Sequence, residues 1–282
     1  MTITVSVVQI EPKLVDKKHN LAKIEQFIRN AVKQSKTTDL IILPELITTG
    51  YECGDQFYDL AEKFPDGESF ELICRLAREH KTHIMFGFAE EDRSIKGVLY
   101  NSVALIDATG TPLGVYRKVH LFGAEMEYFK SGCEYPLFRT AIGNIGIFIC
   151  WDTLFPEVAR IYAIQGADLL AVSTNWEKPY AKEWDFMTSA RAFDNTLHLA
   201  AANRIGFDKT LGFFGHSRVL DPLGEVICAI DEEVESVASA SIELDRTRQL
   251  RREYWTQLRD RRPDTFGLLA RQYSAPGAKG VE

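Results

Sequence analysis

One stretch of the chain, residues 143–157, constrains the fold more than any other. An apolar run, Gly143-Asn144-Ile145-Gly146-Ile147-Phe148-Ile149, reaches Cys150 and is followed by polar residues and then by Pro156 and Glu157. Continuous apolar runs are typical of buried strands, and Pro followed by Glu is typical of the first turn of a helix. The stretch therefore predicts a buried strand, a turn at Cys150 and a helix that starts near Phe155.

Cys150 has two interpretations in this setting. A free cysteine is most often a buried and inert core residue. A thiol between the end of a strand and the start of a helix instead meets amide N–H groups, which stabilise a negative charge and lower the thiol pKa. Such a thiol is suited to nucleophilic attack, so the choice depends on the residues that accompany it.

The rest of the chain alternates between apolar runs and amphipathic segments, which predicts an α/β fold. The predicted strands are 2–10, 39–43, 82–88, 98–107, 115–117, 137–140, 145–149, 168–173, 197–203, 215–220, 225–230 and 238–244. The predicted helices are 17–34, 55–63, 68–80, 155–165, 184–195 and 246–259, and 119–136 is predicted to be a loop. Some strands are joined by helices and others by tight turns, so we expect parallel and antiparallel pairs in the same sheets.

Two short segments of the chain resemble each other. Residues 103–110 and 217–224 both read as a strand, an aspartate, a two-residue turn and a glycine. The match predicts one hairpin pattern used twice, and it also fits two similar halves that each contribute a sheet. No linker rich in Pro, Gly or Ser divides the chain, so we expect a single domain over 1–282, with its core over about 1–245.

Charge and composition exclude several classes of protein. The net charge of −7 argues against nucleic-acid binding, and no apolar stretch is long enough to span a membrane. The chain begins directly with a predicted strand, so no signal peptide is expected, and its five widely spaced cysteines fit free thiols in a reducing cytoplasm. His80 and His83 straddle a predicted helix end and strand start, so we expect no metal site there.

Two further polar residues follow predicted strands in the same way as Cys150. Glu45 comes after the strand at 39–43, and Lys118 ends the strand at 115–117. Functional sites of α/β sheets gather at such carboxyl ends. A carboxylate that takes the thiol proton and an ammonium that stabilises an oxyanion would complete a nucleophilic centre. Taken alone, Glu45 is better explained as a solvated carboxylate at a strand end, and Lys118 is better explained as a surface lysine.

The motifs around these residues resemble those of the nitrilase superfamily of carbon–nitrogen hydrolases, in its amidase and carbamoylase-like branch. The resemblance rests on Leu43-Pro44-Glu45-Leu46, on Tyr116-Arg117-Lys118-Val119-His120-Leu121-Phe122, and on Gly146-Ile147-Phe148-Ile149-Cys150-Trp151-Asp152 with Phe155-Pro156-Glu157. Further matches continue in the same order through 190–195, 202–206 and 215–224. The resemblance implies a four-layer αββα sandwich, two mixed sheets flanked by helices, that pairs into a homodimer through its helical layers.

The resemblance also implies a catalytic triad of Glu45, Lys118 and Cys150, which needs no metal or organic cofactor. Cys150 would attack a small amide and form a thioester, and Glu45 would transfer the protons. The N–H of Trp151 and the Lys118 ammonium would hold the oxyanion. The expected products are a carboxylic acid and ammonia or an amine.

A second glutamate after the lysine is implied as well. Glu125 is the best match for it, and Glu127 is the alternative. This carboxylate would orient either the substrate nitrogen or Lys118.

Several substrate classes remain open. Members of the family hydrolyse amides, N-carbamoyl amines or nitriles, and some hydrolyse glutamine to supply ammonia to a partner chain. In the nitrilase-like branch the cysteine is commonly followed by Trp-Glu, whereas here Trp151 is followed by Asp152. Carboxylate-binding members often place Arg just beyond, where this chain has Thr153-Leu154-Phe155, so we favour a neutral or apolar amide. The residues expected to line the substrate pocket are Asn175, Trp176, Tyr51 and Phe122.

The C-terminal segment, about 246–282, carries a basic run beside aromatic residues. The run is formed by Arg251, Arg252, Arg259, Arg261 and Arg262, next to Tyr254 and Trp255. On an acidic protein, a solvated helix face or a subunit contact explains such a run better than nucleic acid does. Because the C-terminal tail of this family often crosses to the partner subunit, we expect the segment at the interface of a homodimer.

Overall fold

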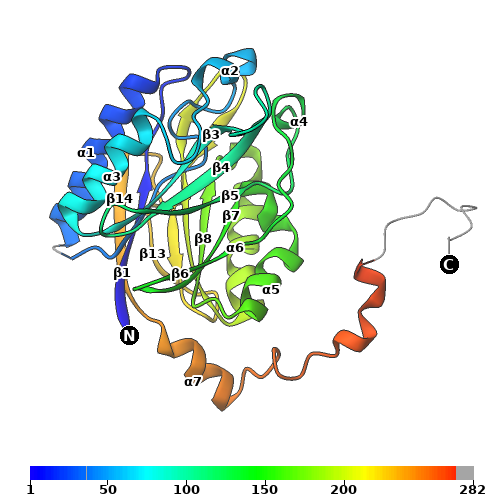
Figure 1. The fold of residues 1–282 in the computed structure, drawn as a ribbon. Helices are drawn as coiled ribbons and strands as arrows, with labels where there is room; N and C mark the ends of the chain where they lie inside the picture. Colours follow the sequence, from blue (N-terminus) through cyan, green and yellow to red (C-terminus); the bar gives the residue numbers. More distant parts are fainter. Residues whose placement is uncertain (36, 271–282) are drawn as a thin grey trace, which may run out of the picture.

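The computed structural model describes residues 1–35 and 37–270 and shows four layers, with two six-stranded sheets face to face between pairs of helices (Figure 1). The strands of the first sheet, in spatial order, are β14 (Ser236–Glu243), β1 (Thr2–Gln9), β2 (Leu40–Ile42), β3 (His83–Glu91), β4 (Leu99–Ile106) and β5 (Pro112–Arg117). Those of the second are β13 (Val226–Ala229), β12 (Arg218–Leu220), β9 (His198–Asn203), β8 (Leu169–Thr174), β7 (Gly143–Ile149) and β6 (Leu137–Thr140). Each sheet mixes parallel and antiparallel pairs, so the expected αββα sandwich is confirmed.

The helices form the two outer layers. The first sheet is covered by α1 (Lys17–Ser35) and α3 (Glu68–His80), and the second by α5 (Pro156–Gln165) and α6 (Ala181–Asn195) (Figure 1). Shorter helices are α2 (Phe57–Leu60), α4 (Glu125–Tyr128) and α7 (Asp245–Glu253). Within the part of the chain that the structure describes, no helix combines the length and the apolar character needed to cross a membrane.

The alternation of side chains along β2 explains why its sequence is apolar throughout. Leu40 and Ile42 belong to the core between the two sheets, whereas Ile41 and Leu43 belong to the core beneath α1 and α3. A strand that is buried on both faces has no solvated side, so each of its positions favours an apolar residue.

The two segments that resemble each other form matching hairpins, one at the edge of each sheet. In the first, Asp107 Oδ1 accepts the N–H groups of Thr109 and Thr111, both along the turn that joins β4 to β5. In the second, Asp221 Oδ1 accepts the corresponding N–H groups between β12 and β13. Gly110 and Gly224 both adopt a φ of 80°, which a side chain would oppose. The repeated pattern is therefore one hairpin design that caps both sheets.

Four segments differ from the sequence-based prediction. The region 119–136, predicted to be a loop, contains the one-turn helix α4. The helix predicted at 55–63 is a 3-10 turn at Gly54–Gln56 followed by α2, because the backbone of Glu62 pairs with Ala89 and Glu91 at the edge of β3. A ribbon of β10 (Ile205–Phe207) and β11 (Gly212–Phe214) was not predicted, since strands of three residues carry almost no periodic signal. The helix predicted at 246–259 ends at Glu253.

After α7 the chain runs as an extended arm with 3-10 turns at Pro263–Thr265 and Gly267–Ala270. The arm leaves the body of the molecule (Figure 1). Residues 271–282, the rest of the predicted tail, lie outside the described residues.

Gly87 in β3 gives a first testable prediction. A Cβ atom at this position would lie 2.5 Å from the backbone nitrogen of Leu46 and 2.7 Å from Glu45 Cα, so Gly87→Ala would push the segment that carries Glu45 away from the sheet. We expect the free energy of unfolding to fall by about 1–3 kcal/mol, measured by urea denaturation.

Gly212→Ala is the matched control for this prediction. The same exchange in β11 meets the flexible side chain of Lys178 at 3.2 Å rather than a backbone. The packing argument is wrong if the two variants lose equal stability.

Candidate active site

The three residues singled out at the ends of predicted strands converge where the two sheets meet. Glu45 follows β2 and Lys118 follows β5, so both come from the first sheet, while Cys150 follows β7 in the second. All three are buried, with Glu45 fully enclosed and Cys150 7% exposed. The site is thus built from both halves of the sandwich.

Lys118 lies between two carboxylates. Its Nζ donates to Glu45 Oε1 at 2.8 Å and to Glu125 Oε1 at 2.6 Å. Glu125, on α4, is buried, whereas Glu127 on the same helix is exposed. The structure therefore brings Glu125 into contact with Lys118 and leaves Glu127 outside the cluster.

Each carboxylate is fixed by further donors. Glu45 accepts hydrogen bonds from Asn101 Nδ2 at 2.6 Å and from the backbone N–H of Asn175 at 2.8 Å. Glu125 accepts the hydroxyl of Tyr51 at 2.7 Å and the N–H of Phe122 at 3.2 Å. Buried carboxylates persist only when their oxygens are paired, and these are paired from several directions.

Tyr51 is in turn fixed by a buried ion pair. Asp208 Oδ2 accepts the backbone N–H groups of Tyr51 and Glu52, and Asp208 Oδ1 accepts Arg204 Nη1 at 2.8 Å. The side chains of Arg204 and Asp208 are both fully enclosed. The loop that carries Tyr51 is therefore attached to the β10–β11 ribbon, which adds a support on the far side of the cluster.

Cys150 occupies a strained turn. Its φ is +43°, in the left-handed region that costs a residue with a side chain about 1–2 kcal/mol. The next residues form a 3-10 turn, Cys150–Leu154, which leads to Pro156 at the start of α5. As the sequence predicts, a strand ends at the thiol, a turn follows and a helix begins near Phe155. The backbone N–H of Trp151 lies in this turn, directly after the cysteine.

Asp152 connects this turn to the strand that carries Lys118. One of its oxygens accepts the Tyr116 hydroxyl at 2.7 Å and the N–H of Ile149 at 3.1 Å, and the other accepts the N–H of His120 at 3.0 Å. Tyr116 lies two residues before Lys118 and His120 two residues after it, and Ile149 directly precedes Cys150. A single buried carboxylate thus fixes the lysine and the cysteine relative to each other.

The charges in the cluster shift its pKa values. Burial, followed by the Glu45 carboxylate, raises the pKa of the Cys150 thiol, against the opposing effect of Lys118. For Lys118 the effect of burial is the opposite, because burial disfavours the charged ammonium and lowers its pKa. The Glu125 and Glu45 carboxylates outweigh this effect and raise the pKa of Lys118 above its usual value. Cys150 is therefore a thiol at rest, and its attack on a substrate needs a base to take its proton.

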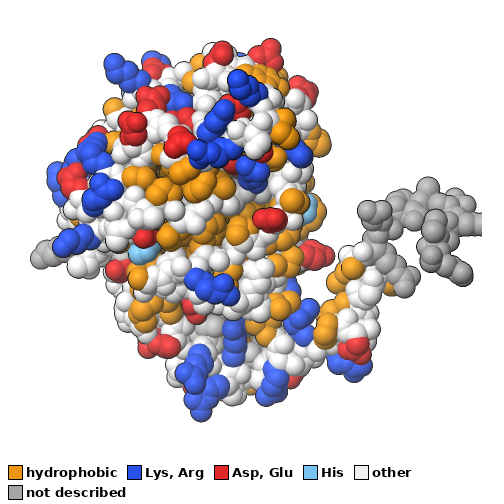
Figure 2. All heavy atoms as spheres, viewed as in Figure 1, with side chains coloured by type: hydrophobic (Ala, Val, Ile, Leu, Met, Phe, Trp, Pro, Cys, Tyr) orange, Lys and Arg blue, Asp and Glu red, His pale blue; other side chains and the backbone are white. Residues whose placement is uncertain are grey.

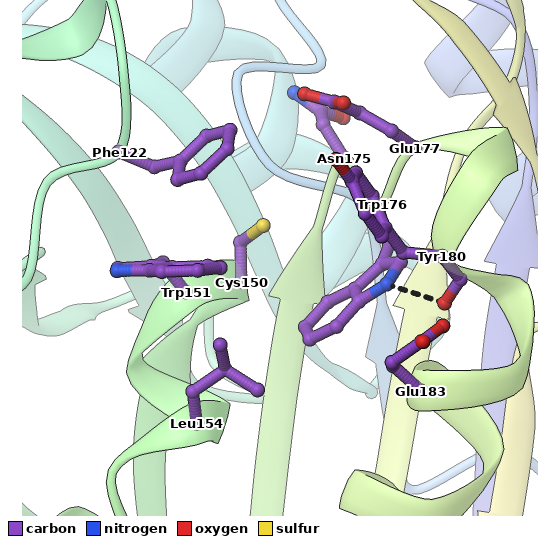
Figure 3. Close-up of a pocket in the computed structure, with 9 residues that line it drawn as sticks. All are labelled: Phe122, Cys150, Trp151, Leu154, Asn175, Trp176, Glu177, Tyr180 and Glu183. Atoms are coloured by element: carbon purple, nitrogen blue, oxygen red, sulfur yellow. Dashed lines mark hydrogen bonds between the residues drawn. The ribbon is translucent and has the colours of Figure 1, made fainter.

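A cavity of about 320 Å³ opens in front of Cys150 (Figure 3). Trp151 and Phe122 lie on one side of the sulfur and Trp176 on the other. The remaining lining residues are Leu154, Asn175, Glu177, Tyr180 and Glu183. Three of the four residues predicted to line a pocket are therefore found here, and the fourth, Tyr51, lines a neighbouring cavity that shares Phe122 and Glu177 with this one.

The sequence reasoning missed two kinds of residue. Asn101 holds Glu45, and the signal for it was a polar residue inside the apolar run of β4. Glu177, Tyr180 and Glu183 line the cavity, but only Glu177 had a signal, because it directly follows the predicted Asn175 and Trp176. Across residues 1–35 and 37–270 no group of three or more His, Cys, Asp or Glu side chains is placed to hold a metal ion.

The fold and the site together define an enzyme of the carbon–nitrogen hydrolase class. The family model described as carbon-nitrogen hydrolase matches residues 4–252. The chain therefore belongs to the carbon–nitrogen hydrolases of the nitrilase superfamily, and the resemblance seen in its motifs is confirmed.

Individual relatives agree with this assignment. A probable nitrilase of Schizosaccharomyces pombe is 47% identical over 95% of this chain and 99% of its own length. An N-carbamoylputrescine amidase of Arabidopsis thaliana is 33% identical over 89% of each. The crystal structure of a carbon–nitrogen hydrolase from Helicobacter pylori G27 superimposes with a TM-score of 0.90 at 29% identity, covering 96% of this chain and 99% of that one.

The charge of the cluster predicts how stability changes with pH. Burial, opposed by Lys118 and reinforced by Glu45, raises the pKa of Glu125 to about 6 from 4.5. The folded protein then binds a proton that the unfolded chain has released, so this group stabilises the fold below about pH 4.5 and loses that contribution as pH rises through about 6. The shift corresponds to about 2 kcal/mol.

Glu125→Gln isolates this contribution. The free energy of unfolding of wild type minus that of the variant, measured by urea titration, should fall by about 2 kcal/mol between about pH 4 and pH 7. A difference that stays constant or rises over this range would show that the Glu125 pKa is not raised.

Proposed function

We propose that the protein is a thiol hydrolase that cleaves the carbon–nitrogen bond of a small amide. The observation that carries the proposal is the buried ammonium of Lys118, hydrogen-bonded to Glu45 and Glu125 beside the cavity that Cys150 lines. A nucleophile, a base and a fixed positive charge are the parts that acyl transfer requires.

In the acylation step, Cys150 Sγ attacks the carbonyl carbon while Glu45 takes the thiol proton. The Trp151 N–H and the Lys118 ammonium stabilise the oxyanion, and one such donor typically contributes about 10²–10³ in rate. The carbon–nitrogen bond then breaks, Glu45 returns the proton to the departing nitrogen, and ammonia or an amine leaves. A thioester remains on Cys150.

In the second step, water attacks the thioester. Glu45 takes a proton from the water, the carbon–sulfur bond breaks, and the proton returns to the cysteine as the carboxylic acid leaves. Glu125 holds the Lys118 ammonium in place through both steps, so we assign it the orienting role.

Asn175 favours an amide over a nitrile. This side chain is 3% exposed and lines the cavity, yet neither its Nδ2 nor its Oδ1 has a hydrogen-bond partner among the described residues. A buried carboxamide requires both an acceptor and a donor. A substrate amide or N-carbamoyl group offers both, whereas a nitrile nitrogen only accepts. A nitrilase and an N-carbamoyl amine hydrolase, the activities in the names of relatives, are the alternatives.

The proposal predicts the products of a substrate panel. Ammonia release from pentanamide, pentylurea and pentanenitrile should be highest for the amide or the urea, and Cys150→Ala should abolish it because no other group can form the thioester. The circular dichroism of the variant should match that of wild type. Turnover by a clean Cys150→Ala preparation would refute the mechanism, and turnover of the nitrile alone would make the protein a nitrilase.

We also propose that the chain forms a homodimer through α5, α6 and the C-terminal arm. Apolar side chains are exposed along these elements, including Ile164 at 55%, Phe186 at 58% and Leu268 at 74%. Figure 2 shows hydrophobic side chains along the arm that leaves the body of the molecule. Exposed apolar side chains grouped on the outer face of neighbouring elements are typical of subunit contacts.

The dimer is tested by measuring mass. Light scattering of the full chain should give about twice the mass of one chain, and Leu268→Ser combined with Leu269→Ser should raise the dimer dissociation constant at least about tenfold, because apolar burial is lost. A monomeric mass for the full chain would refute the dimer. An unchanged dissociation constant in the double variant would show that the arm does not contribute to the interface.

A further inference from the structure

The cavity in front of Cys150 is acidic on one side. Glu177 follows Trp176 after β8, and Glu183 lies in the first turn of α6. Both lie on the Trp176 side of the cavity, across from Phe122 and Trp151 (Figure 3). The carboxylates come from two different elements and reach the same cavity only through the fold.

Within residues 1–35 and 37–270, neither carboxylate has a basic partner or a hydrogen-bond donor. The basic residues nearest in sequence point elsewhere, since Lys178 pairs with Glu233 and Lys182 lies over the ring of Phe186. The residues that line this cavity include no Lys, Arg or His. The cavity therefore presents two carboxylates that make no ion pair within the described residues. A positively charged residue, Lys209, lines the neighbouring cavity, which Glu177 also lines.

Aromatic rings complete the same wall. Trp176 and Tyr180 line the cavity beside the two carboxylates, and Trp151 and Phe122 face them. Carboxylates together with aromatic faces are the groups that attract an alkylammonium ion, by Coulomb and by cation–π interaction. A carboxylate ligand would be repelled by the same wall.

Burial, followed by the Glu52 carboxylate, raises the pKa of Glu177. A cation bound beside Glu177 would lower this pKa again, because a nearby positive charge favours the ionised carboxylate. Without a ligand, the ionised form of Glu177 is therefore disfavoured, and a bound cation would stabilise it.

We propose that the substrate carries an ammonium group a few carbons from the bond that is cleaved, and that Glu177 and Glu183 bind this group. The inference rests on the proposed amide hydrolysis and narrows it: the neutral or apolar amide expected from the sequence becomes an ω-amino amide or ω-amino urea. Leu154 and the ring faces hold the short aliphatic chain, and Asn175 binds the amide or ureido end.

A pair of isosteric substrates tests the proposal. 4-Aminobutanamide differs from pentanamide only in an ammonium in place of a methyl group, and glutaramate places a carboxylate at the same end. We expect kcat/KM for 4-aminobutanamide to exceed that for pentanamide by at least about tenfold, and glutaramate to be the poorest of the three. Pentanamide turned over as fast as its amino analogue would overturn the proposal.

Variants locate the effect. Glu177→Gln and Glu183→Gln should each reduce the ratio of kcat/KM for 4-aminobutanamide to kcat/KM for pentanamide about three- to tenfold, because each removes one of the charges that bind the ammonium. Glu134→Gln, in an exposed loop outside both cavities, is the matched control and should leave the preference unchanged. A preference that survives both substitutions would assign the selectivity to another part of the molecule.

A second measurement does not depend on turnover. Butylammonium should slow the alkylation of Cys150 by iodoacetamide more than butyrate or butanol does, and Glu177→Gln should weaken this protection. Protection by butylammonium without hydrolysis of any amide would refute the proposed reaction and leave the cation site standing. Hydrolysis without protection or preference would refute the cation site alone.

Discussion

The structure depends on one buried ammonium and the two carboxylates beside it. Charges removed from water are destabilising unless their partners are in place, so Lys118, Glu45 and Glu125 require fixed neighbours on all sides. The neighbours come from both sheets: Asn101 belongs to the first, and the backbone of Asn175 follows a strand of the second. The charge cluster is therefore also one of the connections that hold the two sheets in register, and a sheet displacement would leave a buried carboxylate without its donor.

A third carboxylate, that of Asp152, fixes the position of the nucleophile relative to this cluster. Cys150 and Lys118 lie on different sheets, and their separation could vary with the packing between the sheets. Asp152 removes that freedom, because it binds both residues that flank Lys118 and the residue before Cys150. The strained φ at Cys150 is maintained by the same bonds. This explains in physical terms why an aspartate fits two residues after the cysteine: its short side chain stays within the turn.

Local sequence patterns were sufficient for much of the fold. The apolar run of β7 and the Pro-Glu that follows determine a strand, a turn and a helix within fifteen residues, and the cysteine position follows from them. Glu45 and Lys118 also stand directly after strands, but this position alone did not distinguish them from surface residues; the resemblance of their motifs to those of the nitrilase superfamily did. Asn101, Arg204 and Asp208 could not be assigned a role, because their partners lie on other strands and loops and become neighbours only when the sheets assemble. The β10–β11 ribbon, which supports Tyr51, was too short for a periodic signal.

The residues proposed for the reaction can be recognised from local sequence, whereas those proposed for substrate selectivity become neighbours only in the folded chain. The residues proposed to break the bond lie next to strand ends, where sequence motifs mark them and where the backbone fixes their position. The absence of Arg at Thr153-Leu154-Phe155 speaks against a carboxylate-bearing substrate, but it says nothing about a cation. The two free carboxylates belong to a loop after β8 and to the first turn of α6, and the sequence around each is that of an ordinary solvated glutamate. Their effect arises because two unpaired like charges face one small, mostly apolar cavity. The lower dielectric strengthens the field of the half-buried Glu177, whereas Glu183 is exposed and adds its charge at the edge of the cavity.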